Sequence, residues 1–371
     1  MFLRFLQIKR ELLGRARFTK CFWFKVLVLS WPLLAWLGPV PARAAEPAAY
    51  RSAAQAFAAE MVAKNGFDPV ALDRLMDRAR YRQDIVDAMR RPYEGKPWSL
   101  YRPIFLTPAR IEGGRAFWQS HAELLRRAER DYGIPPEVVV AIIGVETSYG
   151  GNLGRHRVID ALTTLGFAYP PRADFFRREL EAFLLLSREE TIDAARVTGS
   201  YAGAVGKPQF IPSSYRAFAV DFDGDGRRDL WRSDADVVGS VANYLRLHGW
   251  RSGEPVALPA TLTPEARAAV AADGLPVARK DPVSPATPAG ELAGRGVTTA
   301  ESLDPATPAV LLVLDESEDE FWIALNNFYV VTRYNRSNLY AMAVHQLGRE
   351  IKALYLATES RQAAANQGGA D

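Results

Sequence analysis

Residues 136–151, which read PEVVVAIIGVETSYGG, decide how the rest of this 371-residue sequence folds. Within this segment, residues 137–149 are nearly all apolar except Glu146 and its polar neighbours, and Gly150 and Gly151 follow them. A helix that is apolar all round is buried inside its protein, and glycine commonly ends a helix. The segment therefore predicts a buried helix that ends with one carboxylate at the edge of the core.

The surroundings of Glu146 favour a protonated carboxyl group. Burial in an apolar environment disfavours the charged form and should raise the pKa of the side chain. Such a group can hold a proton near neutral pH and give it to a leaving oxygen, as a general acid must. The alternative is a structural glutamate that caps a loop or pairs with Arg155, and this segment alone leaves both interpretations open.

The pattern along the chain predicts a mainly helical protein. The pattern of residues 48–91 predicts two or three short helices. Thr107 is expected to cap a further helix that runs to about residue 130. Further helices are expected at residues 172–187, 189–198, 213–219, 234–248 and 337–356. Strands are expected near residues 256–258 and 309–314, whereas residues 321–332 fit either a strand or a helix. The expected fold class is mainly α with a small β-containing insert (α+β).

The first 45 residues have the order of a secretory signal peptide. Basic residues precede the apolar stretch at residues 26–37, and Ala42-Arg43-Ala44 supplies a small-x-small cleavage site. An uncleaved anchor is the alternative. Because Cys21 precedes the apolar stretch, it stands on the wrong side for lipid attachment, and we expect a soluble periplasmic protein. The remaining regions are predicted as a helical catalytic region at 46–250, an insert at 251–320, a return at 321–357 and a disordered tail at 358–371.

Charge and cysteine content exclude several classes of function. Removal of residues 1–44 leaves 38 basic and 42 acidic residues, a formal net charge of −4. Binding to nucleic acid phosphates needs a basic surface, so we expect no nucleic acid partner. Cys21 is the only cysteine, so the exported chain would have no disulfide, cysteine-zinc site or cysteine nucleophile.

Two further segments contain residues suited to a binding site. Residues 199–215 form a glycine-rich loop that leads into a helix, and each glycine costs conformational entropy unless the backbone approaches something closely. Residues 328–341 place Tyr329, Tyr334 and Tyr340 beside amide and hydroxyl groups. Amphipathic rings and amides suit the faces and edges of sugars, although such residues also serve as packing and caps.

Residues 221–229 resemble the start of an EF-hand calcium loop. Glycine stands at the sixth position, as in that loop, and oxygen atoms at alternate positions can converge on one hard cation. The expected ligands are Asp221, Asp223, Asp225, the carbonyl of Arg227, and Asp229. Arg232 replaces the usual glutamate at position twelve, so Asp234 or Asp236 is a candidate for the final ligand. A solvated acidic turn is the alternative to a structural Ca²⁺.

Together these segments resemble the MltB family of lytic murein transglycosylases, from about residue 57 to residue 346. The matching stretches are Gly144-Val145-Glu146-Thr147, Phe167-Ala168-Tyr169-Pro170 with Arg172, Ala202-Gly203-Ala204, Gln209-Phe210 to Tyr215, the acidic loop and Arg333-Tyr334-Asn335. The resemblance implies a lysozyme-like catalytic domain that acts on peptidoglycan strands without a catalytic cofactor. It also makes proteins of cell-wall synthesis or remodelling candidate partners of a monomer.

The resemblance also implies roles for individual residues. Glu146 would be the sole acid/base, and the other residues would orient it or bind the sugar: Ser200, Gln209, Tyr169, Tyr334, Asn335 and Tyr340. Lys207-Pro208 departs from the Tyr-Gly expected in this family, which leaves one subsite wall in doubt. Glu146 would protonate the oxygen of the bond between N-acetylmuramic acid and N-acetylglucosamine. The substrate's own C6 hydroxyl would then attack C1 and form a 1,6-anhydro end.

Two other functions remain open at this point. Most glycosidases use two carboxylates, so a muramidase that adds water would need a second one, for which Asp160 and Asp174 are candidates. A cell-wall binding protein that keeps the site without turnover is the other alternative.

Overall fold

The computed structural model describes residues 47–91, 95–315 and 320–368. Residues Ala44–Asp371 form one compact unit. The predicted signal peptide lies outside the described residues. Within the described residues, no helix has both the length and the apolar character needed to span a membrane.

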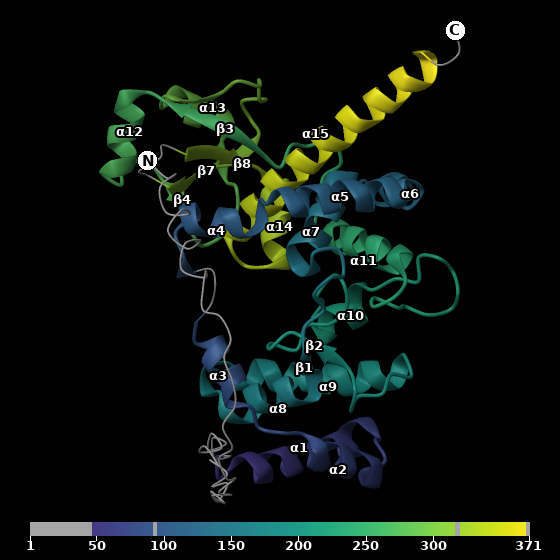
Figure 1. Ribbon diagram of the computed structural model, residues 1–371. Coiled ribbons are helices and arrows are strands. Elements are labelled where there is room, and N and C mark those ends of the chain that lie inside the picture. The colour runs from purple at the N-terminus through teal and green to yellow at the C-terminus, as the bar shows by residue number, and fades with distance from the viewer. Residues whose placement is uncertain (1–46, 92–94, 316–319, 369–371) are drawn as a thin grey trace, which may run out of the picture. The chain divides into compact units, whose positions relative to one another are not determined.

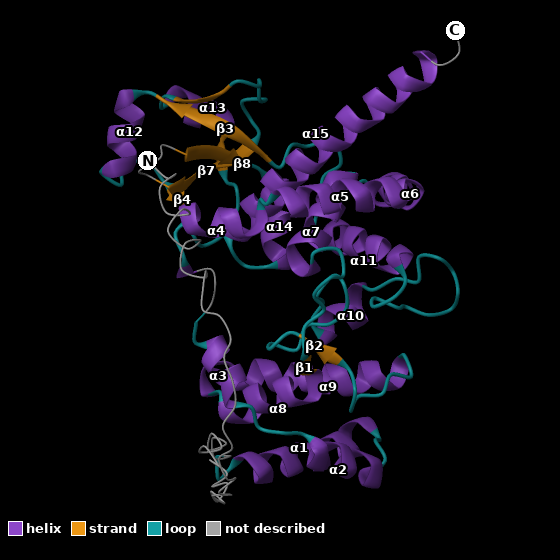
Figure 2. Ribbon diagram, viewed as in Figure 1, coloured by secondary structure: helices purple, strands orange, loops and turns teal. Residues whose placement is uncertain are grey.

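Helices make up most of this unit, as the sequence predicted (Figures 1 and 2). The first group comprises α1 (Tyr50–Asn65), α2 (Pro69–Arg78), α3 (Gln83–Met89), α4 (Trp98–Phe105), α5 (Pro108–Ser120), α6 (Ala122–Tyr132) and α7 (Pro136–Thr147). The second comprises α8 (Val158–Ala168), the 3₁₀ turn Pro170–Arg172, α9 (Ala173–Glu189), α10 (Pro212–Phe218) and α11 (Asp234–Leu247). The last group is α12 (Pro264–Ala271), α13 (Ala289–Gly294), α14 (Asn326–Tyr334) and α15 (Asn338–Gly368).

Most predicted helices are confirmed, and two predictions need correction. Thr107 caps α5 by accepting a hydrogen bond from the Arg110 N–H at 3.2 Å, but the predicted helix divides into α5 and α6. The helix predicted at residues 189–198 is wrong, because α9 ends at Glu189. Asp193 there accepts a hydrogen bond from the Ala195 N–H at 3.0 Å, a local bond that competes with helix formation.

The sheet contains strands from the second half of the chain. Its order is β4-β7-β8-β3-β6, and β5 also pairs with β7. All of these pairs are antiparallel except β4 with β7. The strands are β3 (Ala257–Leu262), β4 (Val277–Ala278), β5 (Thr287–Pro288), β6 (Val297–Thr299), β7 (Pro308–Asp315) and β8 (Glu320–Ala324). A separate pair joins β1 (His156–Arg157) to β2 (Thr198–Gly199).

The sheet has a hydrophobic cluster of its own, formed by apolar residues between Leu262 and Leu325. The ambiguous residues 321–332 supply both β8 and the start of α14. Because β8 pairs with β3 and β7, the sheet continues past the predicted boundary at residue 320.

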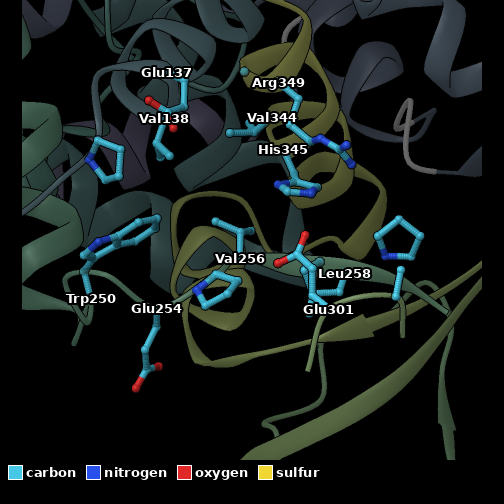
Figure 3. Close-up of a pocket in the computed structure, with 16 residues that line it drawn as sticks. Glu137, Val138, Trp250, Glu254, Val256, Leu258, Glu301, Val344, His345 and Arg349 are labelled. Atoms are coloured by element: carbon cyan, nitrogen blue, oxygen red, sulfur yellow. The ribbon is translucent and has the colours of Figure 1, made fainter. Parts of the chain in front are cut away.

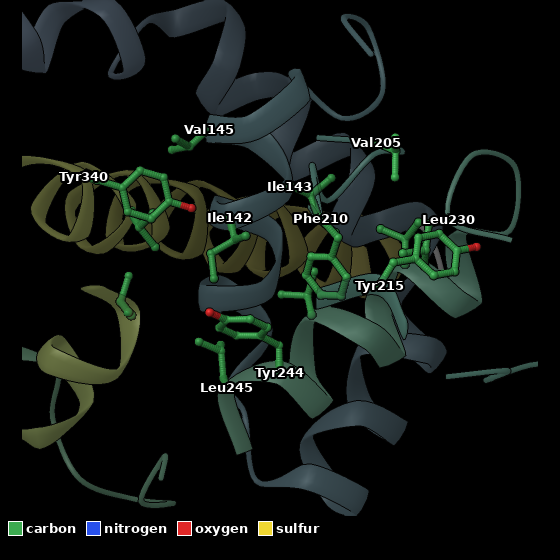
Figure 4. Packing of buried hydrophobic residues seen from close by; sticks show 14 of the residues in the cluster. Ile142, Ile143, Val145, Val205, Phe210, Tyr215, Leu230, Tyr244, Leu245 and Tyr340 are labelled. Carbon is green, nitrogen blue, oxygen red and sulfur yellow. The ribbon is translucent and has the colours of Figure 1, made fainter. Parts of the chain in front are cut away.

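Helix α7 lies in the main core and packs against α5, α6, α11 and α15. Figure 4 shows Ile142, Ile143 and Val145 of α7 among other buried side chains, which confirms the predicted buried helix. Helix α15 approaches α7 closely at Gly348, where an added Cβ would lie 2.9 Å from the Glu137 carbonyl oxygen. The predicted disordered tail from residue 358 is wrong as far as Gly368, because α15 continues to that residue.

Candidate active site

Glu146 is the second-to-last residue of α7 and is half-buried. Pro135 and Pro136 begin this helix, and Ser148 ends it in the left-handed conformation with φ of 50°. The Ser148 N–H donates to the Gly144 carbonyl at 3.0 Å, which closes the last turn. The end of a rigid, buried helix thus fixes the position of the carboxylate.

Tyr340 of α15 holds one oxygen of that carboxylate. Its hydroxyl donates a hydrogen bond to Glu146 Oε1 at 2.7 Å, and only 2% of the Tyr340 surface is exposed. Burial raises the pKa of the Tyr340 hydroxyl well above its usual range, and the nearby charge of Glu146 raises it further. Tyr340 therefore keeps its proton and remains a donor to Glu146.

Thr147 joins the end of α7 to the glycine-rich loop. Its hydroxyl donates to the Lys207 carbonyl at 2.8 Å and accepts from the Gly150 N–H at 3.0 Å. Only 1% of Thr147 is exposed, so both bonds form away from water. The residue next to the carboxylate consequently fixes the distance between α7 and the loop.

Ser200 shapes the glycine-rich loop from within. Its hydroxyl oxygen accepts hydrogen bonds from the N–H groups of Ala202 at 3.2 Å and Ala204 at 3.0 Å. A Cβ added at Gly199 would lie 2.1 Å from the Ala204 carbonyl oxygen, so this tight turn requires glycine.

Gln209 stands in the same loop with a strained backbone, at φ of 51°. Its side-chain amide donates to the Gly206 carbonyl at 3.0 Å and to the Leu153 carbonyl at 3.4 Å. Val205 and Phe210 on either side form an isolated antiparallel bridge. The loop is therefore a closed hairpin-like turn with Gln209 at its centre.

Tyr334, the last residue of α14, connects this loop to Tyr340. Its hydroxyl donates to the Pro208 carbonyl at 2.6 Å, and its ring stacks on that of Tyr340 with centroids 6.3 Å apart. Burial raises the pKa of the Tyr334 hydroxyl, and the charge of Glu146 adds to this increase. Asn335 follows directly, and its carbonyl accepts from the Ser337 N–H at 2.7 Å.

The structure thus connects several of the residues selected from sequence. Glu146, Tyr340 and Tyr334 form one chain of contacts that reaches the loop bearing Ser200 and Gln209. Tyr169 caps the end of α8 and is half-buried. Its side chain forms no hydrogen bond with another described residue.

Sequence reasoning missed the positioning roles of Thr147 and Lys207. Lys207 forms an ion pair with Asp234 at 2.5 Å, and its carbonyl accepts the bond from Thr147. The signal available in the sequence was a threonine placed directly between the carboxylate and the break at Gly150 and Gly151. The departure at Lys207-Pro208 keeps the loop attached, because both residues use backbone carbonyls for these contacts.

The acidic loop brings together three carboxylates: two of the expected ligands, Asp221 and Asp223, and Asp236, one of the two candidates for the final ligand. Ligand atoms of Asp221, Asp223 and the buried Asp236 all lie within 4.8 Å of one another. Asp229 instead accepts hydrogen bonds from the N–H groups of Trp231 at 2.9 Å and Arg232 at 3.0 Å. Burial raises the pKa of Asp236, whereas hydrogen bonds led by that of the Gly226 N–H lower the pKa of Asp221.

A half-buried carboxylate at the end of a core helix, held by a tyrosine beside a glycine-rich loop, defines a site for acid/base chemistry. The family model described as the transglycosylase SLT domain matches residues 49–349. The chain belongs to this family of lytic transglycosylases, an enzyme class of glycan lyases with a lysozyme-like fold.

Named relatives agree with this family. The chain is 42% identical over 309 residues to the membrane-bound lytic murein transglycosylase B of Escherichia coli, which covers 80% of this chain and 82% of that protein. The crystal structure of the soluble lytic transglycosylase SltB1 from Pseudomonas aeruginosa matches with a TM-score of 0.75 and 48% identity. That match covers 81% of this chain and 99% of SltB1.

A third relative was solved with a metal ion. The lytic transglycosylase Slt35 of Escherichia coli in complex with calcium matches with a TM-score of 0.73 and 42% identity. This match covers 82% of the present chain and 93% of Slt35.

Proposed function

We propose that this protein cleaves the β-1,4 bond between N-acetylmuramic acid and N-acetylglucosamine in peptidoglycan and forms 1,6-anhydro ends. The observation that carries the proposal is the hydrogen bond from Tyr340 to Glu146 Oε1. It gives one carboxylate oxygen a buried donor and so fixes the orientation of the carboxyl group at the end of α7. The relatives named as murein transglycosylases support the choice of peptidoglycan.

Glu146 acts first as a general acid and then as a general base. It protonates the glycosidic oxygen as the bond to C1 breaks, and the N-acetyl group of the substrate stabilises the positive charge that develops. The Glu146 carboxylate then removes the proton from the C6 hydroxyl, whose oxygen bonds to C1. One carboxylate suffices because the nucleophile belongs to the substrate and has a high effective concentration.

The Tyr340 hydroxyl stabilises the carboxylate form of Glu146, which develops as the proton leaves. Tyr334 holds the loop at Pro208, and Ser200 shapes the loop from which Gln209 faces the sugar. We assign Asn335 and Tyr169 to the sugar-binding surface by their place in the family pattern.

The two candidates for a second carboxylate have other partners. Asp160 is 2% exposed, pairs with Arg157 and accepts a hydrogen bond from the Arg80 N–H at 2.8 Å. Asp174 is exposed and pairs with Arg177, one turn further along α9. We therefore propose a single-carboxylate reaction.

The substitution Glu146→Gln tests this assignment. It keeps the shape of the side chain and removes the acid, so cleavage of purified peptidoglycan should stop while binding to peptidoglycan persists. Retained turnover by this variant would exclude Glu146 as the acid. Loss of both binding and the folded state would be detected by thermal melting, and Tyr340→Phe would then test the site independently.

We further propose a structural Ca²⁺ bound by Asp221, Asp223 and Asp236. Clustered carboxylates are the oxygen ligands that Ca²⁺ prefers, and an ion would offset their mutual repulsion. The calcium complex of Slt35 supports this assignment. Such an ion would join the loop to α11, which carries Asp236 in its first turn.

The N-terminal sequence and the relative named as membrane-bound support an enzyme of the cell envelope. We propose that the signal peptide at residues 1–45 exports the chain to the periplasm. We also propose that the region at 46–250 and the return at 321–357 together form the catalytic part, and that residues 251–320 form an accessory insert.

A further inference from the structure

A cavity of 480 Å³ lies between helices α7 and α15 and the first strand of the sheet, β3 (Figure 3). We call it the seam pocket; its lining residues include Glu137, Trp250, Leu258, Glu301, His345 and Arg349. Its volume falls in the range of small-molecule sites. Glu137 is the second residue of α7, nine residues before Glu146, so about 14 Å of helix separates this cavity from the catalytic carboxylate.

Two polar atoms of the seam pocket residues are buried without a hydrogen-bond partner. They are the indole N–H of Trp250 and Nε2 of His345. A buried polar group that lacks a partner loses its hydrogen bonds to water without replacement, so such groups are rare and call for an explanation. Burial lowers the pKa of His345 to about 4, and the charge of Arg349 contributes to the decrease. The imidazole is therefore neutral at ordinary pH.

The seam pocket is also lined by two exposed side chains of opposite charge, Glu301 and Arg349. Among the described residues, neither the Glu301 carboxylate nor the Arg349 guanidinium has a hydrogen-bond or ion-pair partner, and they do not pair with each other. The other two carboxylates are engaged, since Glu137 pairs with Lys352 at 2.7 Å and Glu254 with Arg251 at 3.3 Å. In Figure 3, Glu301 points toward His345, whereas the carboxylate of Glu254 points away.

The two opposite charges and the two unpartnered polar atoms favour a zwitterionic ligand with a small apolar part. A carboxylate and a guanidinium can bind an ammonium and a carboxylate group, and the indole and imidazole can bond its amide groups. Val138, Val256 and Val344 form an apolar wall that suits methyl groups. Glu301 and Arg349 are both exposed to solvent, so they can reach the charged groups of a ligand that enters the seam pocket from outside.

We propose that the seam pocket binds the free end of a peptide carried by peptidoglycan. This inference rests on the proposed function, because peptidoglycan is a glycan that carries short peptides with free ammonium and carboxylate groups. An extended peptide of four residues spans roughly 13–14 Å, similar to the length of α7 between the two sites. Peptide binding there would contact α7 and α15, the two helices that carry Glu146 and Tyr340.

Calorimetric titration of the full chain tests the proposal with peptides that an amidase has released from purified peptidoglycan. The wild type should bind them, and Arg349→Ala should weaken the dissociation constant at least ten-fold. Trp250→Phe keeps most of the ring and removes the N–H, so it should weaken binding three-fold or more. Arg361→Ala, on the same helix α15 but away from the seam pocket, is the matched control and should bind like the wild type.

A second experiment, a cleavage assay, distinguishes failure of the peptide-binding proposal from failure of the proposed reaction. Arg349→Ala should cleave glycan strands stripped of peptide at the wild-type rate, whereas Glu146→Gln should bind the peptides normally and cleave nothing. Absent peptide binding in the wild type, or equal binding by Arg349→Ala and Trp250→Phe, would overturn the inference. Free D-alanine that binds as tightly as the peptides would also overturn it, since the site would then recognise a single amino acid.

Discussion

Replacement of Tyr340 by phenylalanine should slow cleavage with little effect on stability. The substitution removes only the hydroxyl that donates to Glu146 Oε1 at 2.7 Å, and the buried ring remains. A hydrogen bond to a charged group contributes about 1.5–3 kcal/mol. Because the carboxylate becomes charged as it gives up its proton, most of that energy acts in the transition state.

The expected decrease in kcat is therefore about 10- to 150-fold. Release of soluble products from purified peptidoglycan under substrate saturation measures it, and thermal melting reports on the fold. Tyr355→Phe is the matched control, because Tyr355 lies on the same helix and stacks on Trp118 outside the site. A rate for Tyr340→Phe within two-fold of the wild type would refute the role assigned to this hydroxyl.

Three further predictions concern stability. Thr147→Val removes the hydroxyl that bonds the Lys207 carbonyl and the Gly150 N–H, so the free energy of unfolding in urea should fall by about 2–4 kcal/mol. A decrease equal to that of Thr358→Val on α15 would contradict this prediction. Folding lowers the pKa of His345 from 6.5 to about 4. The free energy of unfolding should therefore keep the His345 contribution above pH 6.5 and lose about 3 kcal/mol as the pH falls toward 4. Unfolding measured across that range should lose this component in His345→Gln but keep it in His248→Gln. Ca²⁺ at 100 times its dissociation constant should raise the free energy of unfolding of the wild type by about 2.7 kcal/mol and leave that of Asp236→Asn unchanged. Equal wild-type melting temperatures with Ca²⁺ and with a chelator would exclude the ion.

The sequence predicts the elements whose signals are local. The uninterrupted apolar pattern of α7 and the Thr107-Pro108 start of α5 are read directly from neighbouring residues, and both are present. The helix expected at residues 189–198 fails because a local side-chain bond of Asp193 competes with the helical pattern. The length of α15 was underestimated, because its last turns lack the apolar spacing on which the prediction relied.

Contacts between distant segments could not be read from the sequence. Tyr340 and Glu146 are 194 residues apart, and Thr147 meets Lys207 across 60 residues. The sequence left Asp234 and Asp236 open as the final ligand, and the return of α11 beside the acidic loop places Asp236 with Asp221 and Asp223, whereas Asp234 pairs with Lys207. Spacing within the loop favoured Asp229, whose carboxylate instead caps the turn at Trp231. Family resemblance selected the site residues, whereas the structure shows which of them contact one another.

The central claim is that Glu146 cleaves the glycan with the substrate's own hydroxyl as nucleophile. Mass spectrometry of products from purified peptidoglycan, digested in parallel by the wild type and by Glu146→Gln, tests it most directly. The wild type should release fragments lighter by one water than hydrolysis products, and the variant should release none. Fragments that have gained a water, or equal release by both proteins, would contradict the account.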